Sequence, residues 1–143
     1  MLKKTIKYTD FDGNVREEDF WFNLTKAEIA EMELSQAGGL EKYYEKIIKT
    51  QNQPKLVEIF KSLILKSYGE KSDDGRRFVK SPELTQAFTE TQAYSDLFME
   101  LASNADSALA FCRGIMPADM ANNPEVAKAA ANISSLPTVT ENN

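Results

Sequence analysis

Apolar and polar residues alternate along the first part of the chain, which is the period of a β-strand rather than a helix. The stretch TIKYTDFDGNVREEDFWFNL is interrupted by Asp12-Gly13, and glycine accepts the positive φ that a tight hairpin turn requires. We therefore expect strands at residues 2–10 and 14–22. Because an isolated hairpin is only marginally stable in water, its aromatic side chains should pack against the helices that follow.

A helical period replaces this alternation after residue 24. Thr25 and Glu28 have the spacing of a capping box, which predicts a helix to about Gln36 and a stop at Gly38-Gly39. A second amphipathic helix is expected over residues 40–48, where apolar residues recur at helical spacing. This stripe comprises Leu40, Tyr43, Tyr44, Ile47 and Ile48.

The widest apolar stripe predicts a third helix at residues 54–68, and Pro54 suits its first turn. The sequence Ser81-Pro82-Glu83 is typical of a helix start and predicts a fourth helical segment at residues 82–101. A break is expected near residues 89–91. A last helix should follow Asn104 as its N-cap and end at Pro117.

The most charged stretch, SYGEKSDDGRRFVKSPEL, connects the third and fourth helices. We interpret its centre as a connector in which Asp73-Asp74-Gly75 forms an Asx-type turn, while Arg76 and Arg77 pair with nearby carboxylates. An EF-hand alignment fails because Ser81 stands where a bidentate glutamate is required, and the glycines and lysine of a P-loop are absent. A rigidly held arginine pair can nevertheless recognise the carboxylates of a partner.

Residues 118–143 contain no aromatic residue and end in small, polar and proline-punctuated sequence. Such a composition buries too little apolar surface to offset the entropy of ordering, so we expect a mobile tail. The predicted fold class is α+β, mostly α. An N-terminal β-hairpin packs on a bundle of about five helices within a domain at residues 1–117, and a flexible C-terminal tail follows.

Composition narrows the function. The chain has 143 residues with 42% hydrophobic and 27% charged residues, which is typical of one globular domain. Acidic residues outnumber basic ones by 22 to 17, giving a net charge of −5. This balance disfavours nucleic acids and anionic membranes as partners. With a single cysteine, Cys112, and no apolar run suited to a signal peptide or membrane helix, we expect a cytoplasmic protein.

Histidine is absent from the sequence. Its absence removes the usual general base, the Ser-His-Asp and Cys-His arrangements and nearly every zinc site. We therefore expect a protein that is not an enzyme and uses neither a cofactor nor a metal.

Several segments together resemble the tail assembly chaperones of long-tailed bacteriophages. They are TDFDGNVREEDFWFNLTKAEIAEME, GGLEKYYEKII, IFKSLILKSYGEKSDDGRRFVKS and AFTETQAYSDLFMEL, and YGEKSDDGRRFVKS is the most distinctive part. The resemblance covers residues 1 to about 117. It implies a small, acidic, non-catalytic protein of the host cytoplasm. Such a protein would coat the hydrophobic tape-measure protein, keep it soluble and help to recruit tail-tube subunits.

A chaperone for a long amphipathic helix needs an apolar groove to receive it. Our hypothesis is that the third and fourth helices border this groove. The apolar candidates for contact are Phe60, Ile64, Phe88 and Phe98, each of which would equally suit an ordinary core, and the polar candidates are Arg76 and Arg77. Two other classes remain open, namely a structural subunit retained in a phage tail or neck and a small non-enzymatic regulatory or adaptor protein. Self-association into a homo-oligomer also remains open.

Overall fold

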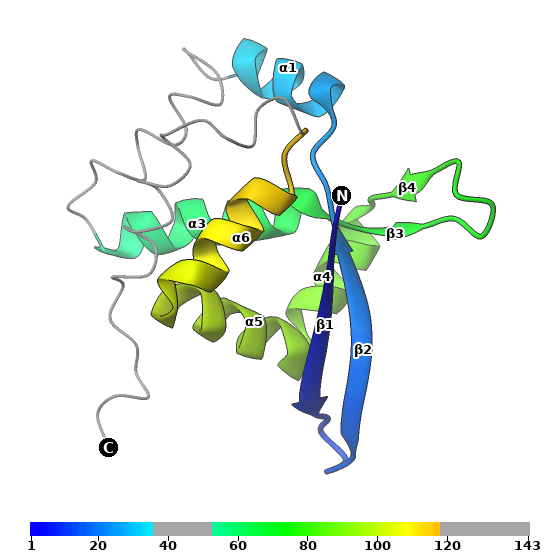
Figure 1. Ribbon diagram of the computed structural model, residues 1–143, viewed down its shortest axis with the longest axis vertical. Helices are drawn as coiled ribbons and strands as arrows, with labels where there is room; N and C mark the ends of the chain where they lie inside the picture. Colours follow the sequence, from blue (N-terminus) through cyan, green and yellow to red (C-terminus); the bar gives the residue numbers. More distant parts are fainter. Residues whose placement is uncertain (36–52, 118–143) are drawn as a thin grey trace.

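The computed structural model describes residues 1–35 and 53–117, which form a mixed α+β fold with helices in the larger share (Figure 1). The elements follow the order β1 (Leu2–Thr9), β2 (Val15–Phe22), α1 (Lys26–Ser35), α3 (Gln53–Ser67), β3 (Tyr68–Lys71), β4 (Phe78–Val79), α4 (Pro82–Thr89), α5 (Gln92–Ser103) and α6 (Ala105–Gly114). The helix expected at residues 40–48 and the tail expected at 118–143 lie outside the described residues. The division of the chain at residue 117 stays a prediction.

The expected N-terminal hairpin is confirmed, and β1 pairs with β2 in antiparallel register from Leu2↔Phe22 to Thr9↔Val15. Its turn is organised by Asp10, whose Oδ1 accepts hydrogen bonds of 2.9 Å from the backbone N–H groups of Asp12 and Asn14. Gly13 supplies the positive φ, at 86°. The turn of this hairpin is therefore formed by residues within it.

A second hairpin, β3–β4, stands where the sequence predicted only a connector, and that prediction is wrong in this respect. Lys71 pairs with Phe78 across the hairpin, and β3 joins the first hairpin through Trp21↔Gly69 and Phe22↔Tyr68. The sheet order is β1-β2-β3-β4. Figure 1 shows the two hairpins pointing in different directions from this shared base.

Each described helix start that the sequence predicted from capping chemistry is confirmed. Thr25 and Glu28 form the capping box, with Thr25 N donating to Glu28 Oε1 at 2.8 Å and Glu28 N donating to Thr25 Oγ1 at 3.1 Å. Side-chain oxygens also cap α4, α5 and α6, from Ser81, Thr91 and Asn104 respectively. The break expected near residues 89–91 separates α4 from α5.

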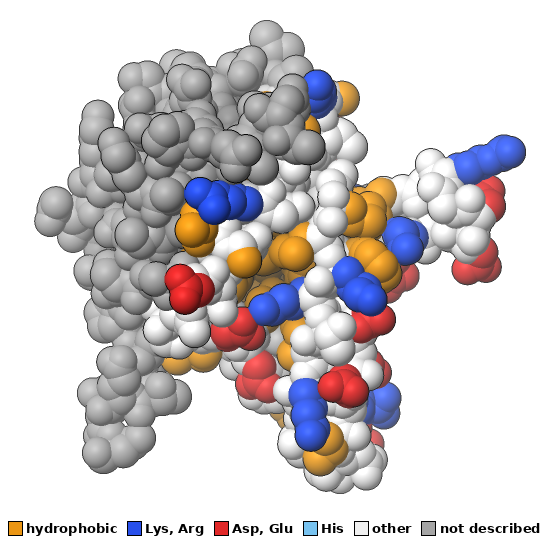
Figure 2. Space-filling model, viewed as in Figure 1, with side chains coloured by type: hydrophobic (Ala, Val, Ile, Leu, Met, Phe, Trp, Pro, Cys, Tyr) orange, Lys and Arg blue, Asp and Glu red, His pale blue; other side chains and the backbone are white. Residues whose placement is uncertain are grey.

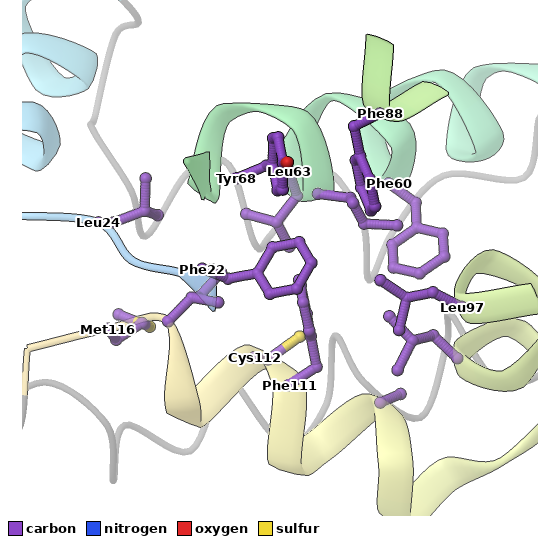
Figure 3. Packing of buried hydrophobic residues seen from close by; sticks show 14 of the residues in the cluster. Phe22, Leu24, Phe60, Leu63, Tyr68, Phe88, Leu97, Phe111, Cys112 and Met116 are labelled. Carbon is purple, nitrogen blue, oxygen red and sulfur yellow. The ribbon is translucent and has the colours of Figure 1, made fainter. Parts of the chain in front are cut away.

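The hydrophobic core lies between the base of the sheet and helices α3 to α6, and Phe22 is at its centre (Figure 3). The ring centroid of Phe22 lies 5.2 Å from that of Phe111, 5.8 Å from that of Tyr68 and 5.9 Å from that of Phe88. Its side chain is 0% exposed. One residue at the end of β2 therefore joins elements from three distant parts of the sequence.

The end of α6 lies against the base of the first hairpin. Leu24 N donates a 2.7 Å hydrogen bond to the carbonyl oxygen of Ile115. Gly114 approaches the start of β1 so closely that a Cβ placed on it would lie 2.8 Å from Leu2 Cδ1. A larger residue at position 114 would therefore require the Leu2 side chain to move.

Candidate functional site

The four apolar residues proposed to contact a partner all belong to the core or its margin. Phe60 and Ile64 are 0% exposed and Phe88 is 2% exposed. Phe98 is partly buried, with its ring centroid 5.1 Å from that of Phe60. Contact with a partner through Phe60, Ile64 or Phe88 would therefore require the core to open, and their role in binding stays a prediction.

A groove of about 820 Å³ lies between α3 and the start of α4. These are the two helices that the sequence led us to propose as its borders. Most of the residues that line it are polar and flank the apolar stripes, whereas Leu65 is apolar. They include Lys61, Ser62, Leu65, Pro82, Thr85 and Gln86. Lys61 and Leu65 each follow a buried residue, Phe60 and Ile64 respectively, and this position beside the buried stripe is the signal that could have identified them.

The groove combines a short apolar surface with a basic rim. Leu65 packs against the core from the groove side, while Lys61 and Lys66 are exposed on α3. Glu58 is an acidic residue in the lining. A helix that laid an apolar stripe on Leu65 and Pro82 would therefore meet lysine side chains beside that stripe.

Lys80 closes one end of the groove and fixes the elements around it. Its Nζ donates to Glu28 Oε2 at 2.6 Å and to the backbone oxygens of Asn23 and Lys66, each at 2.8 Å. Burial raises the pKa of the Glu28 carboxyl, but the hydrogen bonds from Lys80 and Thr25 outweigh that effect and the pKa is lowered overall. The groove therefore has a preformed, rigid end where α1, α3 and α4 meet.

The two arginines lie at the far end of the β3–β4 hairpin, where Figure 2 shows basic side chains projecting from the molecule. The expected Asx turn is confirmed, because Asp74 Oδ1 accepts from Arg76 N at 3.0 Å and from Ser72 Oγ at 2.7 Å. These hydrogen bonds lower the pKa of Asp74. Arg76 Nε lies 3.9 Å from Asp74 Oδ2 with its side chain 87% exposed, so this pairing leaves the guanidinium in solvent.

A second hollow, of about 660 Å³, lies where the two hairpins diverge. Its lining includes Asp19, Trp21, Gly69, Glu70, Lys71 and Asp73. Lys71 Nζ lies 3.8 Å from the centroid of the Trp21 ring and Lys3 Nζ lies 5.9 Å from it, distances at which an ammonium is attracted to the face of an aromatic ring. We refer to this hollow as the fork cleft.

The described residues hold neither an exposed thiol nor a metal-binding cluster. Cys112 is 0% exposed, and burial raises the pKa of its thiol to about 12, so the nucleophilic thiolate is suppressed. Within residues 1–35 and 53–117, no group of three or more metal-ligating side chains is placed to hold an ion. None of the described helices is long and apolar enough to cross a membrane.

Comparison with known protein families gives a match over the whole chain. A family model described as phage tail assembly chaperone matches residues 1–143, which is the whole chain. No curated protein and no solved structure matches the chain.

Proposed function

The chain belongs to the phage tail assembly chaperone family, and from this premise we propose that it binds the tape-measure protein and keeps it soluble while tail-tube subunits are recruited. The proposed role is non-enzymatic and takes place in the host cytoplasm. A chaperone of this kind must hold an apolar helix without joining it in an aggregate, so it needs a receiving surface and a charged exterior. The net charge of −5 serves the second need.

The observation that supports the first need is the groove between α3 and α4. Its volume is about 820 Å³, and its lining combines the apolar Leu65 and Pro82 with polar and lysine side chains. An amphipathic helix in such a groove presents apolar residues at i, i+3, i+4 and i+7 to its floor. The lysines at the rim favour a helix with acidic residues beside its apolar stripe, because opposite charges across an interface set its register.

The test is co-expression of the tape-measure protein with and without this chain, followed by measurement of the soluble tape-measure fraction. We expect that fraction to fall when the chaperone is omitted. An unchanged soluble fraction would contradict the proposed function.

The groove itself is tested by a matched pair of substitutions on α4. Gln86 lines the groove, whereas its neighbour Ala87 is exposed but does not line it. Gln86→Trp should fill the groove and lower the recovery of soluble tape-measure protein, while Ala87→Trp should leave recovery near the wild-type level. Equal recovery with both variants would place the tape-measure contact elsewhere on the chain.

The exchange Arg77→Glu tests the arginine pair in the same assay.

A further inference from the structure

The fork cleft exposes a strand edge that the groove does not use. The two hairpins share only the pairs Trp21↔Gly69 and Phe22↔Tyr68. From Phe20 back to Val15, the only described strand that pairs with β2 is β1. The other edge of β2 therefore borders the cleft without a strand partner in the described part of the chain.

The register shows which backbone groups this edge presents. Asp10 N donates to Asn14 O at 2.8 Å next to the hairpin turn, and hydrogen-bonded pairs alternate with non-bonded pairs along an antiparallel ladder. It follows that Val15, Glu17 and Asp19 direct their N–H and C=O groups away from β1. These three residues make the open edge of β2.

The strand β3, on the opposite side of the cleft, also directs backbone N–H and C=O groups into it. Ser72 N donates to Arg77 O at 2.8 Å, so Ser72 and Arg77 are a hydrogen-bonded pair of the β3–β4 hairpin. By the same alternation, Lys71 directs its N–H and C=O away from β4 and towards the cleft. Backbone donors and acceptors therefore face the cleft from both hairpins.

The charge of the cleft selects the kind of strand that fits. Its lining contains four carboxylate residues, Glu18, Asp19, Glu70 and Asp73, against the single lysine Lys71. Figure 2 shows acidic side chains along β2 and at the far end of the β3–β4 hairpin. A strand laid in this cleft would be attracted if it were basic and repelled if it were acidic.

The existing partner of β2 already places basic residues on the outer face of the hairpin. On the outer face of the first hairpin, β1 places Lys3 opposite Trp21 and Lys7 opposite Glu17. Opposite charges at directly facing positions stabilise a strand pair. A second strand on the other edge of β2 would place every second side chain on the outer face, beside Glu17 and Asp19. Basic residues at alternate positions would therefore lie next to acidic ones.

We propose that the open edge of β2 binds an extended segment of a partner protein that carries lysine or arginine at alternate positions, and that the segment adds to the sheet as a further strand. Acidic residues on a strand edge discourage pairing with uncharged or acidic strands, so the edge is selective as well as open. This interaction surface lies apart from the α3/α4 groove and does not depend on the proposed function.

The test uses a synthetic peptide of about eight residues in which lysine alternates with threonine, since strand addition needs only a short extended segment. Trp21 is the single tryptophan of the chain and lines the cleft, so its fluorescence should report peptide binding. We expect the amide protons of Val15, Glu17 and Asp19 to exchange with solvent at least ~10-fold more slowly when the peptide is bound. A peptide with glutamate in place of lysine should have no such effect.

A matched pair of proline substitutions distinguishes the loss of the β2 edge from general disruption of the hairpin. Glu17 and Lys7 face each other across the hairpin, and by the alternation both direct their N–H groups outwards, on opposite edges. Proline is tolerated where an edge N–H faces solvent. Glu17→Pro should weaken peptide binding at least ~10-fold because it removes a donor and blocks the edge, whereas Lys7→Pro should bind the peptide as the wild type does.

Three results of the peptide experiments would overturn the proposal. They are unchanged exchange at the three amides with saturating peptide, equal loss of binding in both proline variants, and equal binding of the acidic peptide. Protection that appears without peptide and grows with protein concentration would assign the edge to a second copy of this chain and would also overturn it. The co-expression assay measures a different property, so failure of either proposal is distinguishable from failure of the other.

Discussion

Tyr68 and Phe88 stack on each other, with ring centroids 4.2 Å apart and ring planes inclined by only 11°. Tyr68 begins β3 and Phe88 lies near the end of α4, so the contact spans the whole β3–β4 hairpin. Both rings also lie within 6 Å of Phe22. The base of the second hairpin is thereby fixed to the core, although its far end is exposed.

Removal of the Phe22 ring should therefore be among the most destabilising changes in the described chain. We expect Phe22→Ala to lower the free energy of unfolding by about 3–5 kcal/mol, because the buried ring is lost and a cavity remains. Phe11→Ala is the matched control, since Phe11 is 78% exposed and its loss should change stability by no more than about 0.5 kcal/mol. Urea denaturation followed by circular dichroism measures both, and similar values for the two would contradict the assignment of Phe22 to the core.

Lys80 should contribute to stability more than any exposed lysine. Lys80→Met keeps the aliphatic stem but removes three hydrogen bonds, including the one to Glu28. We expect a loss of about 1.5–3 kcal/mol, the usual range for hydrogen bonds that involve a charged group. Lys61→Met, at an exposed position in the same groove, should cost less than about 0.5 kcal/mol. Equal urea midpoints for the two variants would show that the hydrogen bonds of Lys80 do not contribute measurably to stability.

The Glu28–Lys80 pair should also make stability depend on pH. The pKa of Glu28 is lower in the folded than in the unfolded chain. The contribution of the pair is therefore fully present above the unfolded pKa of about 4.3 and is lost as the pH falls through the folded pKa. Glu28→Gln should accordingly lose less stability than the wild type between pH 7 and pH 3, the range that brackets that pKa. Parallel stability curves over this range would contradict the prediction.

Cys112 should resist thiol reagents in the native protein. Burial leaves its side chain 0% exposed and raises its pKa to about 12, and the thiolate is the reactive form. We expect labelling with a disulfide reagent at pH 8 to be slow until denaturant is added. In a Cys112→Ala background, Ser95→Cys at an exposed position of α5 should react at once. Rapid labelling of native Cys112 would show that α6 opens readily.

The sequence predicted the elements whose signals are local. The first hairpin follows from its alternation and from Gly13, and the starts of α1, α4 and α6 follow from capping residues such as Ser81. For α5 the sequence predicted only the break before it. The second hairpin was missed because its strands are very short, and because β3 is fixed by pairing with Trp21, far away in the sequence. The hydrophobic periodicity of a short segment does not indicate which distant strand it pairs with.

The candidate site was predicted less well, for a related reason. The pattern identified α3 and α4 as walls of a groove. However, the most apolar residues on those helices, such as Phe60 and Phe88, are buried in the core. The groove is lined by residues beside the stripe, such as Ser62 and Thr85. Their exposure depends on how two helices meet, which a single helix's periodicity does not determine.

The contact between Leu2 and Gly114 brings the beginning of β1 and the end of α6 together. A short linker from residue 117 to the N-terminus should therefore span the gap without strain, and the turn between Ser72 and Arg77 offers an exposed place to reopen the chain. We expect such a circular permutant to retain the pairing of β2 with β3 and the ring cluster around Phe22. Its new termini would emerge at the far end of the second hairpin, away from the core.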